Sequence, residues 1–451
     1  MRTPKILLIS ANICQDPYKV FPLGMMCLFS YIKEHFPEWE VSFFDFNLQT
    51  FDEYSELLQQ NDFQFIAISL RNCDDVNYFA KNSFVDHYVS ICKLSRQKSN
   101  AKLIAGGPCV SIFPEEILKL LDLDYAVVGE GEQSLTELIH KIINGENETS
   151  VEGLVYRKEE KITVNPRLHF LTESKVRFDE KLSQFYFNES GMLNIQTKRG
   201  CPYRCIYCSY PVIDGRQVRT LDPKLVVENI KELYFKQNIN YLFFTDSVFN
   251  ICEDYNIELA NYMIESKVKV RWGAYFSPYQ FKKENLALYQ RAGLTHIEFG
   301  TDSLSDIQLK NYKKHFTFQD IKHASDICYD LGIFYAHFLI LCGIGETEET
   351  LNETFENSKK LQHTVYFPFI GMRIYPETEL YEIGIKEGII SKDEVLKPVY
   401  YISQNCNVET LVERAAQTGK KWVFPNEEKN PIIDKLRAKK RRGPLWEYLR
   451  Y

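Results

Sequence analysis

The sequence has no excess of positive charge. Its 54 lysines and arginines are outnumbered by 61 aspartates and glutamates, which gives a net charge of −7 at pH 7. Nucleic-acid binding requires a basic surface that neutralises phosphates, so we expect no nucleic-acid partner. The basic stretch at residues 435–442 is predicted to be the solvated face of a helix near the C-terminus.

Long hydrophobic runs are absent as well. The apolar stretch at residues 365–372 is short and contains Pro368, so it does not reach the length of a membrane span. The N-terminus reads as a basic start followed by a strand, and it lacks a small-residue cleavage site. With 451 residues, the chain is long enough for about two or three domains with substantial cores. These features predict a large cytoplasmic protein without a membrane span.

The 12 cysteines lack the regular spacing of a disulfide framework, so we expect reduced thiols in a reducing compartment. Three of them stand apart, because Cys201, Cys205 and Cys208 form a CxxxCxxC pattern directly after a strand-like run. A zinc site would need a fourth Cys or His close by, and none lies within a short window on either side. Three unrelated reduced cysteines are the other alternative to a metal cluster.

Three thiolates can hold three irons of a cubane, so a [4Fe-4S] cluster here would keep one iron open to a small chelating molecule. Gly200 and Pro202 fit the tight, non-helical loop that brings the thiolates together. Tyr207 lies between the last two cysteines and is predicted to pack against a bound cofactor. The spacing therefore favours a cluster over zinc or unrelated thiols.

This loop and the surrounding chain resemble the radical S-adenosylmethionine (SAM) superfamily, whose commonest signature is this cysteine spacing. In that family the open iron binds the amino and carboxylate groups of SAM. The resemblance implies reductive cleavage of SAM to methionine and a 5′-deoxyadenosyl radical. It also implies a reductant protein, such as flavodoxin or ferredoxin, as a partner.

Residues 1–140 alternate strands with helices in the manner of a parallel sheet. Several short apolar strands run into turns, as a doubly wound nucleotide-type fold requires, because its ligand sits beyond the carboxyl ends of the strands. Taken one at a time, such turns are ordinary connections between a strand and a helix. The predicted strands are 5–10, 41–44, 65–70, 102–105 and 125–128, and helices are predicted at 22–34 and 84–95.

Together with the cysteine loop, this region resembles the cobalamin-binding domain of cobalamin-dependent radical SAM enzymes. The resemblance implies that corrin is bound by residues at these turns, namely Ser69, Arg71, Gly106, Gly107, Gly129 and Glu130. The loop at 12–24 contains no histidine, so an imidazole ligand to cobalt from that loop is excluded. A domain that has lost cobalamin binding would produce the same sequence picture.

The alternation breaks at residues 141–190, which are predicted to be a linker that contains a hairpin. It resumes at 191–395, where six strands separated by helix-length segments predict a partial (β/α)6 barrel. A small helical C-terminal extension is predicted at 396–451. The six strands are 193–197, 241–244, 268–275, 296–299, 335–341 and 366–372.

Functional groups of such a barrel collect at the carboxyl ends of its strands. The family resemblance implies a SAM site there, formed by Asp246, Ser247, Glu298, Gly300, Gly343 and Arg373. A carboxylate such as Asp246 would meet the methionyl ammonium or order the loop, and Glu298 would accept from ribose or ammonium donors. Each polar residue has a structural alternative as a strand-end cap or an internal salt bridge.

The sequence thus predicts an α/β protein with a Rossmann-like cobalamin-binding domain, a partial radical SAM barrel and a C-terminal extension. The preferred activity is that of a cobalamin-dependent methyltransferase acting on an unactivated carbon of a small-molecule, lipid or peptide substrate. The alternatives are a radical rearrangement or cyclisation in which cobalamin is no methyl donor or is absent, and a non-catalytic iron-sulfur or corrinoid-binding protein. No catalytic residue is assigned beyond the three cysteines.

Overall fold

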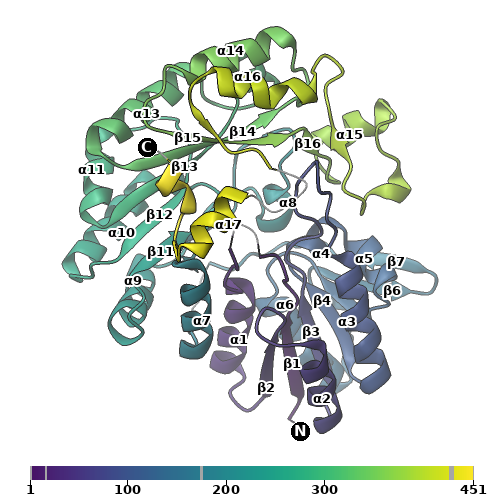
Figure 1. Ribbon diagram of the computed structural model, residues 1–451. Coiled ribbons are helices and arrows are strands. Elements are labelled where there is room, and N and C mark those ends of the chain that lie inside the picture. The colour runs from purple at the N-terminus through teal and green to yellow at the C-terminus, as the bar shows by residue number, and fades with distance from the viewer. Residues whose placement is uncertain (1–2, 16–17, 173–175, 426–430, 450–451) are drawn as a thin grey trace. The chain divides into compact units, whose positions relative to one another are not determined.

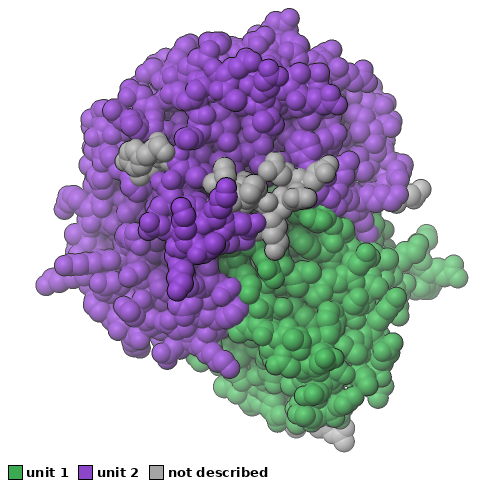
Figure 2. Space-filling view, viewed as in Figure 1, with its two compact units in different colours: residues 1–75, 82–179, 209–215 green, residues 76–81, 180–208, 216–451 purple. Residues whose placement is uncertain are grey.

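The computed structural model describes residues 3–15, 18–172, 176–425 and 431–449. The chain divides into two compact units, which Figure 2 colours separately. Unit 1 comprises residues 1–75, 82–179 and 209–215, and unit 2 comprises 76–81, 180–208 and 216–451. Within the described part of the chain, no helix has the length and apolar character needed to cross a membrane.

Unit 1 is built on a seven-stranded sheet of order β2-β1-β3-β4-β5-β6-β7 (Figure 1). The first five strands are parallel, which confirms the predicted doubly wound sheet. Their ends lie within one or two residues of the predicted ones. The strands are β1 (Lys5–Ser10), β2 (Glu40–Asp45), β3 (Phe65–Ser69), β4 (Lys102–Gly106), β5 (Tyr125–Val127), β6 (Leu154–Lys158) and β7 (Lys161–Val164).

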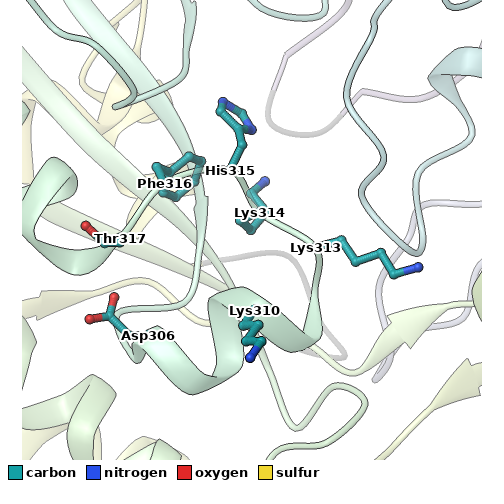
Figure 3. Close-up of a pocket in the computed structure, with 7 residues that line it drawn as sticks. All are labelled: Asp306, Lys310, Lys313, Lys314, His315, Phe316 and Thr317. Carbon is teal, nitrogen blue, oxygen red and sulfur yellow. The ribbon is translucent and has the colours of Figure 1, made fainter.

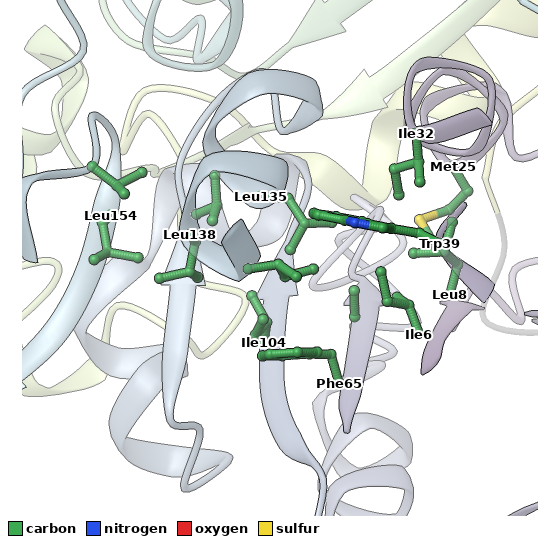
Figure 4. Packing of buried hydrophobic residues seen from close by; sticks show 14 of the residues in the cluster. Ile6, Leu8, Met25, Ile32, Trp39, Phe65, Ile104, Leu135, Leu138 and Leu154 are labelled. Atoms are coloured by element: carbon green, nitrogen blue, oxygen red, sulfur yellow. The ribbon is translucent and has the colours of Figure 1, made fainter. Parts of the chain in front are cut away.

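A hydrophobic core forms between this sheet and two of its helices (Figure 4). Ile6 and Leu8 alternate along β1 toward this core, and Leu135, Leu138 and Ile139 give α6 an apolar stripe at helical spacing. The helices of unit 1 are α1 (Leu23–His35), α2 (Phe51–Gln60), α3 (Val85–Lys98), α4 (Pro108–Ile112), α5 (Pro114–Leu120), α6 (Glu132–Asn144), the 3-10 turn η1 (Glu148–Ser150) and α8 (Tyr210–Asp214).

The predicted hairpin is present as β6 and β7, but it does not stand apart from the sheet. β6 pairs antiparallel with β5, and β7 pairs antiparallel with β6. Leu154 and Val155 of β6 are fully buried, because pairing with β5 brings them into the core of unit 1. The assignment of this hairpin to a linker is therefore corrected: it forms the edge of the first sheet.

Unit 2 contains a second seven-stranded sheet, of order β18-β15-β14-β13-β12-β11-β8, in which every neighbouring pair is parallel. The six predicted strands are all present in chain order, which confirms the partial barrel. The strands are β8 (Leu193–Ile195), β11 (Tyr241–Phe244), β12 (Arg271–Phe276), β13 (Leu294–Asp302), β14 (Phe334–Leu341), β15 (Val365–Ile370) and β18 (Lys421–Trp422).

Two short antiparallel ladders flank this sheet: β9 (Lys198–Arg199) with β10 (Arg219–Thr220), and β16 (Met372–Arg373) with β17 (Tyr400–Tyr401). The helices of unit 2 are α7 (Glu180–Ser190), α9 (Pro223–Lys231), the π-turn η2 (Glu232–Lys236), the 3-10 turn η3 (Phe249–Ile251), α10 (Glu253–Glu265), α11 (Lys283–Arg291), α12 (Asp306–Asn311), α13 (Phe318–Leu331), α14 (Glu348–Ser358), α15 (Glu379–Lys386), η4 (Lys392–Glu394), η5 (Val408–Thr410), α16 (Leu411–Gln417), α17 (Pro431–Ala438) and η6 (Leu445–Leu449).

The C-terminal extension is helical only in part. It contributes β17 and the seventh strand β18, whose Trp422 stacks on Tyr366 with ring centroids 4.5 Å apart. Trp446 is buried against Ala336 and Val365, at the amino-terminal ends of β14 and β15. A strand of two residues is too short to produce a period-two pattern, so the sequence did not reveal it.

One disulfide corrects the expectation that all cysteines are reduced. Cys73 follows β3 and Cys109 lies in α4, and the two are bonded with their Cα atoms 5.4 Å apart. Because β3 and β4 are parallel neighbours, the connections that follow them meet at the same edge of the sheet. The ten other cysteines form no disulfide in the described structure.

Thiol counting checks this disulfide. We expect alkylation of the denatured, cofactor-free chain to modify ten cysteines, and alkylation after reduction to modify all 12, as read by intact mass. Twelve modified cysteines without reduction would contradict the disulfide. Peptide mapping supplies the control, because the two protected residues should be Cys73 and Cys109 and no others.

Candidate functional site

The cysteine loop lies between β9 and α8, beyond the carboxyl end of β8. Gly200 has φ +89°, a left-handed conformation that favours glycine, so the sharp turn predicted before Cys201 is present. Cys201 is buried, whereas Cys205 and Cys208 are half-buried. The backbone N–H of Cys208 donates to the carbonyl of Cys205 at 3.2 Å, which holds these two residues in one tight turn.

The three thiols share one environment. Tyr203 interacts electrostatically with Cys201 and Cys205, and Tyr207 with Cys205 and Cys208. Among the described residues, no three His, Cys, Asp or Glu side chains meet as a ready site for a single metal ion. A cubane differs from such a site because each thiolate binds its own iron. Three thiols on one loop, without a fourth ligand, therefore fit a cluster better than zinc.

A buried carboxylate anchors the start of this loop. Asp246, two residues after β11, accepts the backbone N–H groups of Thr197 at 2.7 Å and of Lys198 at 3.0 Å. Its other oxygen lies 3.0 Å from the Lys198 ammonium, and both side chains are at most 2% exposed. Ser247 adds a bond from its hydroxyl to the carbonyl of Gly200 at 3.1 Å. The predicted residues Asp246 and Ser247 thus both hold the loop.

The Lys198 side chain is almost completely buried. Its ammonium donates to Asn256 at 2.8 Å and lies 4.3 Å from the ring centroid of Phe249. Burial lowers the pKa of Lys198 below its ordinary value, and the charge and hydrogen bond of Asp246 oppose that effect. Asp246 therefore compensates a buried cation three residues before Cys201.

A second buried pair lies on the other side of the cysteine loop. Asp302, the last residue of β13, receives a hydrogen bond from the Tyr207 hydroxyl and lies 2.7 Å from the Lys314 ammonium. Burial raises the pKa of the Cys205 thiol, and the nearby positive charge of Lys314 opposes that effect. Tyr207, predicted to pack against a cofactor, is thus tied to the barrel through Asp302. Lys314 follows a short helix and belongs to no motif, so sequence reasoning missed it.

A cavity of about 630 Å³ lies beside Lys314 (Figure 3). It is lined by Asp306, Lys310, Lys313, Lys314, His315, Phe316 and Thr317. His315 stacks on Tyr203 of the cysteine loop with ring centroids 3.7 Å apart, and burial lowers its pKa to about 4. His315 therefore both lines this cavity and packs against the cysteine loop.

Glu298 lies in the middle of β13 and forms no ion pair with any described residue. Its carboxylate accepts a hydrogen bond from Trp446 Nε1 at 3.1 Å. Burial, with the nearby charge of Glu447, raises the pKa of Glu298 to about 7. Two residues on, Gly300 is exposed and has open space where a Cβ atom would be. This part of β13 therefore leaves room for a ligand to approach the backbone, and SAM binding there stays a prediction.

Aromatic side chains share this face of the sheet. In the strand register, Tyr275 is the partner of Glu298, and Phe338 is the partner of both Gly300 and Phe367. Tyr275 is 36% exposed. The rings of Phe338 and Phe367 stack with centroids 5.0 Å apart. The carboxylate of Glu298 is therefore set beside a largely apolar surface.

Two other predicted SAM residues make contacts within unit 2. Gly343 faces the Tyr312 hydroxyl, which a Cβ atom would meet at 2.2 Å, so packing alone requires glycine there. Arg373 is buried and donates to the carbonyls of Ile374 at 2.6 Å and Val395 at 3.3 Å. A role of either residue toward SAM stays a prediction.

The predicted corrin residues lie at the carboxyl edge of the first sheet. Gly107 has φ +97°, and a Cβ atom there would meet the Leu70 carbonyl at 2.9 Å. Ser111 joins two of the turns, since its hydroxyl donates to Gly107 O at 3.1 Å and accepts from Gly129 N at 2.7 Å. Ser69, Arg71 and Gly106 end or follow β3 and β4 and are partly exposed.

Glu130 differs from these residues, because its side chain is already bonded to other residues of unit 1. Its carboxylate lies 2.9 Å from Arg167 and accepts the backbone N–H of Leu171 at 3.0 Å. By contrast, Gly24 in the first turn of α1 is exposed and has nothing within 4 Å of an added Cβ atom. An exposed glycine at a helix start, beside the carboxyl ends of parallel strands, fits a bulky ligand such as corrin.

Comparison with known proteins agrees with both halves of this description. A family model of the radical SAM superfamily matches residues 195–357, and a model of the B12 binding domain matches residues 10–139. The solved structure of the radical SAM methyltransferase TsrM from Kitasatospora setae, with tryptophan and a SAM analog bound, has a TM-score of 0.89. It is 20% identical and covers 99% of this chain and 97% of its own, which shows a shared fold.

Two curated relatives align at low identity. An uncharacterized methyltransferase of Pyrococcus horikoshii is 23% identical over 378 residues, which are 82% of this chain and 79% of the relative. An anaerobic magnesium-protoporphyrin IX monomethyl ester cyclase of Cereibacter sphaeroides is 28% identical over 270 residues, which are 57% of this chain and 44% of the cyclase. The chain thus spans less than half the length of the cyclase.

The anchor of the cysteine loop can be tested by stability. We expect Asp246→Asn to lower the free energy of unfolding by about 3–5 kcal/mol, because it leaves the Lys198 ammonium buried without a counter-ion. The double variant Lys198→Met/Asp246→Asn should lose less, since no unpaired charge remains. The control Glu253→Gln, in an exposed pair with Lys282, should cost at most about 1 kcal/mol. Equal losses for Asp246→Asn and Glu253→Gln in thermal unfolding would contradict the anchor.

The raised pKa of Glu298 predicts a pH-dependent stability. Between the ordinary pKa of 4.5 and about 7, the unfolded chain has lost this proton and the folded chain has kept it, so stability falls as pH rises through that window. Glu298→Gln has no proton to lose and still accepts from Trp446. Its thermal stability relative to the parent should therefore rise between pH 5 and pH 8, by at most about 3 kcal/mol. The exposed control Glu265→Gln should show a constant difference, and a constant difference for Glu298→Gln would refute the assignment.

Proposed function

Because the chain belongs to the radical SAM superfamily and carries a B12-binding domain, we propose that it is a cobalamin-dependent enzyme that methylates an unactivated carbon. The observation that carries this proposal is the loop of Cys201, Cys205 and Cys208 at the carboxyl edge of a partial barrel. The relative of Pyrococcus horikoshii, named a methyltransferase, and the fold shared with TsrM support the methyl-transfer chemistry.

When bound, a [4Fe-4S] cluster with SAM supplies reductive radical chemistry, and cobalamin supplies a methyl carrier. The three cysteines hold the cluster, and Tyr207 fixes the turn between the last two of them through Asp302. Asp246 and Ser247 keep the beginning of the loop in place. In this proposal Asp246 serves SAM binding indirectly, because its carboxylate is already occupied by Lys198.

SAM itself is assigned to the region around Glu298 and Gly300. Open space at Gly300 lets a ligand approach the backbone of β13, and the Glu298 carboxyl can accept a hydrogen bond from a hydroxyl or an ammonium. The apolar face with Tyr275 and Phe338 would keep water and reactive side chains away from a carbon radical. Gly343 and Arg373 are assigned to the same site as supports, because Gly343 packs against the Tyr312 hydroxyl and the Arg373 side chain donates to the carbonyl of Ile374.

Cobalamin is assigned to the carboxyl edge of the first sheet, with Ser69, Arg71, Gly106, Gly107 and Gly129 at the turns. Glu130 supports these turns through Arg167. We propose domain boundaries at residues 1–140, 141–190, 191–395 and 396–451, with the hairpin of the second segment joined to the first domain.

We place the enzyme in the cytoplasm. Its partners would be a reductant protein such as flavodoxin or ferredoxin and a small-molecule, lipid or peptide substrate. A second candidate is a radical cyclisation or rearrangement in which cobalamin handles electrons or is absent. The similarity to the magnesium-protoporphyrin IX monomethyl ester cyclase favours this candidate.

Label transfer tests the proposal. The full chain, reconstituted without oxygen, is incubated with SAM labelled at its methyl group, hydroxocobalamin and a chemical reductant. We expect release of 5′-deoxyadenosine and labelled methylcobalamin, both read by mass spectrometry. A cluster-loaded chain that releases no 5′-deoxyadenosine would falsify the radical assignment. Release without corrin binding or label on cobalamin would favour the second candidate.

The cysteine variants are the matched controls. Cys201→Ala, Cys205→Ala and Cys208→Ala should each abolish cluster binding and 5′-deoxyadenosine release, because each removes one of three ligands. Cys252→Ala, which removes a half-buried free thiol outside the loop, should keep both. The same loss in all four variants would argue against the assigned ligand set.

A further inference from the structure

The segment after α12 is fixed against the cysteine loop at three points. The backbone N–H of Ile206 donates to the Tyr312 carbonyl at 3.3 Å. His315 stacks on Tyr203, and the Lys314 ammonium is close enough to Cys205 for the two groups to interact electrostatically. These contacts come from consecutive parts of one short segment. The position of Lys314 relative to Cys205 is therefore determined by neighbours on both sides.

Lys314 is unusual for a lysine, because its side chain is only 8% exposed. Its ammonium lies 2.7 Å from Asp302 Oδ2, and the same carboxylate oxygen accepts the hydroxyl of Tyr207. Asp302 is itself only 8% exposed along its side chain. Two donors on one carboxylate oxygen hold the ammonium between Asp302 and Cys205.

The neighbouring residue Lys313 is exposed, as most lysines are, and so provides a comparison for the buried Lys314. Its side chain is 48% exposed, pairs with Glu379 at the surface and extends away from Lys314 (Figure 3). An exposed pair of this kind contributes little to stability, whereas a buried charge is costly unless it is well compensated. The fold thus keeps one cation at the surface and buries the next one beside a cluster ligand.

We propose that Lys314 is an electrostatic positioning residue that acts through Cys205 to make the cluster easier to reduce, with Asp302 holding it in place. The inference rests on the proposed function in one respect, the presence of a cluster on Cys201, Cys205 and Cys208. It concerns a step that precedes SAM cleavage and methyl transfer and can be measured without either.

The physical basis is the charge that reduction adds. One electron passes from an external donor to the cluster, no bond is made or broken, and the cluster becomes more negative by one charge. A hydrogen bond to a ligand sulfur and a nearby fixed positive charge both stabilise that added charge. Because the side chains of Lys314 and Asp302 are buried, bulk ions screen this interaction little.

The sign of the effect differs between the two partners. Removing the cation should make reduction harder. Removing the Asp302 charge should make reduction easier, because its negative charge lies on the Lys314 side of Cys205 and opposes the added electron. A merely structural disturbance would not give opposite signs for two residues that contact each other.

The experiment is a redox titration of the cluster in the reconstituted full chain, followed by electron paramagnetic resonance, without SAM, cobalamin or substrate. For Lys314→Met we expect the equilibrium constant for one-electron reduction to fall at least tenfold, a shift of about 59 mV to more negative potential. The matched control Lys313→Met should leave the potential unchanged. Iron and sulfide are counted in every variant.

Asp302→Asn should shift the potential in the positive direction, and Lys314→Arg, which keeps the charge, should restore most of the parent value. Equal potentials for Lys314→Met and Lys313→Met would overturn the proposal, as would negative shifts for both Lys314→Met and Asp302→Asn. If Lys314→Met assembles no cluster, the sign for Asp302→Asn decides. A parent with a cluster but no methyl transfer contradicts the proposed function alone, and a parent without a cluster contradicts both.

Discussion

The buried ion pair between Lys198 and Asp246 determines where the cysteine loop begins. The carboxylate joins the loop after β11 to the backbone N–H groups of Thr197 and Lys198, which follow β8. Two charges this deeply buried are tolerated only when each is paired and its remaining hydrogen-bonding capacity is filled. The start of the loop therefore has one favourable position, and Cys201 follows it three residues later. Cys201, the first predicted ligand, is therefore oriented by contacts that require no cofactor.

The carboxylates near this barrel edge have different neighbours and therefore different properties. Asp246 and Asp302 each compensate a buried lysine, Lys198 and Lys314, on the two sides of the cysteine loop. Glu298 accepts a hydrogen bond from a neutral indole, and burial raises its pKa to about 7. The two aspartates therefore position the loop through their ion pairs. Glu298 can change its protonation state near neutral pH, beside open space at Gly300.

Much of the fold could be predicted because it depends on local patterns. Apolar patterns located most strands of both sheets, and local caps such as Asp222, which accepts the N–H of Lys224 at 2.8 Å, begin the helices between them. Contacts between distant residues left no such pattern. Lys198 pairs with a residue 48 positions away, and Cys73 is bonded across 36 positions. The burial of Lys314 likewise results from tertiary packing, which one sequence does not encode in any nearby spacing.

The contacts of strand-end residues also restrict where a ligand can bind the barrel. To reach the carboxylate of a ligand, Arg373 would have to break its hydrogen bonds to the carbonyls of Ile374 and Val395. Each broken bond would leave a buried carbonyl without a hydrogen-bond partner. The Tyr312 hydroxyl fills the space next to Gly343, so a ligand cannot approach there. Gly300 has open space, and the Tyr275 ring is partly exposed at the position paired with Glu298. A ligand therefore breaks the fewest contacts at the carboxyl ends of β12 and β13. The segment from Asp302 to Lys314, which contacts the cysteine loop, follows β13 directly.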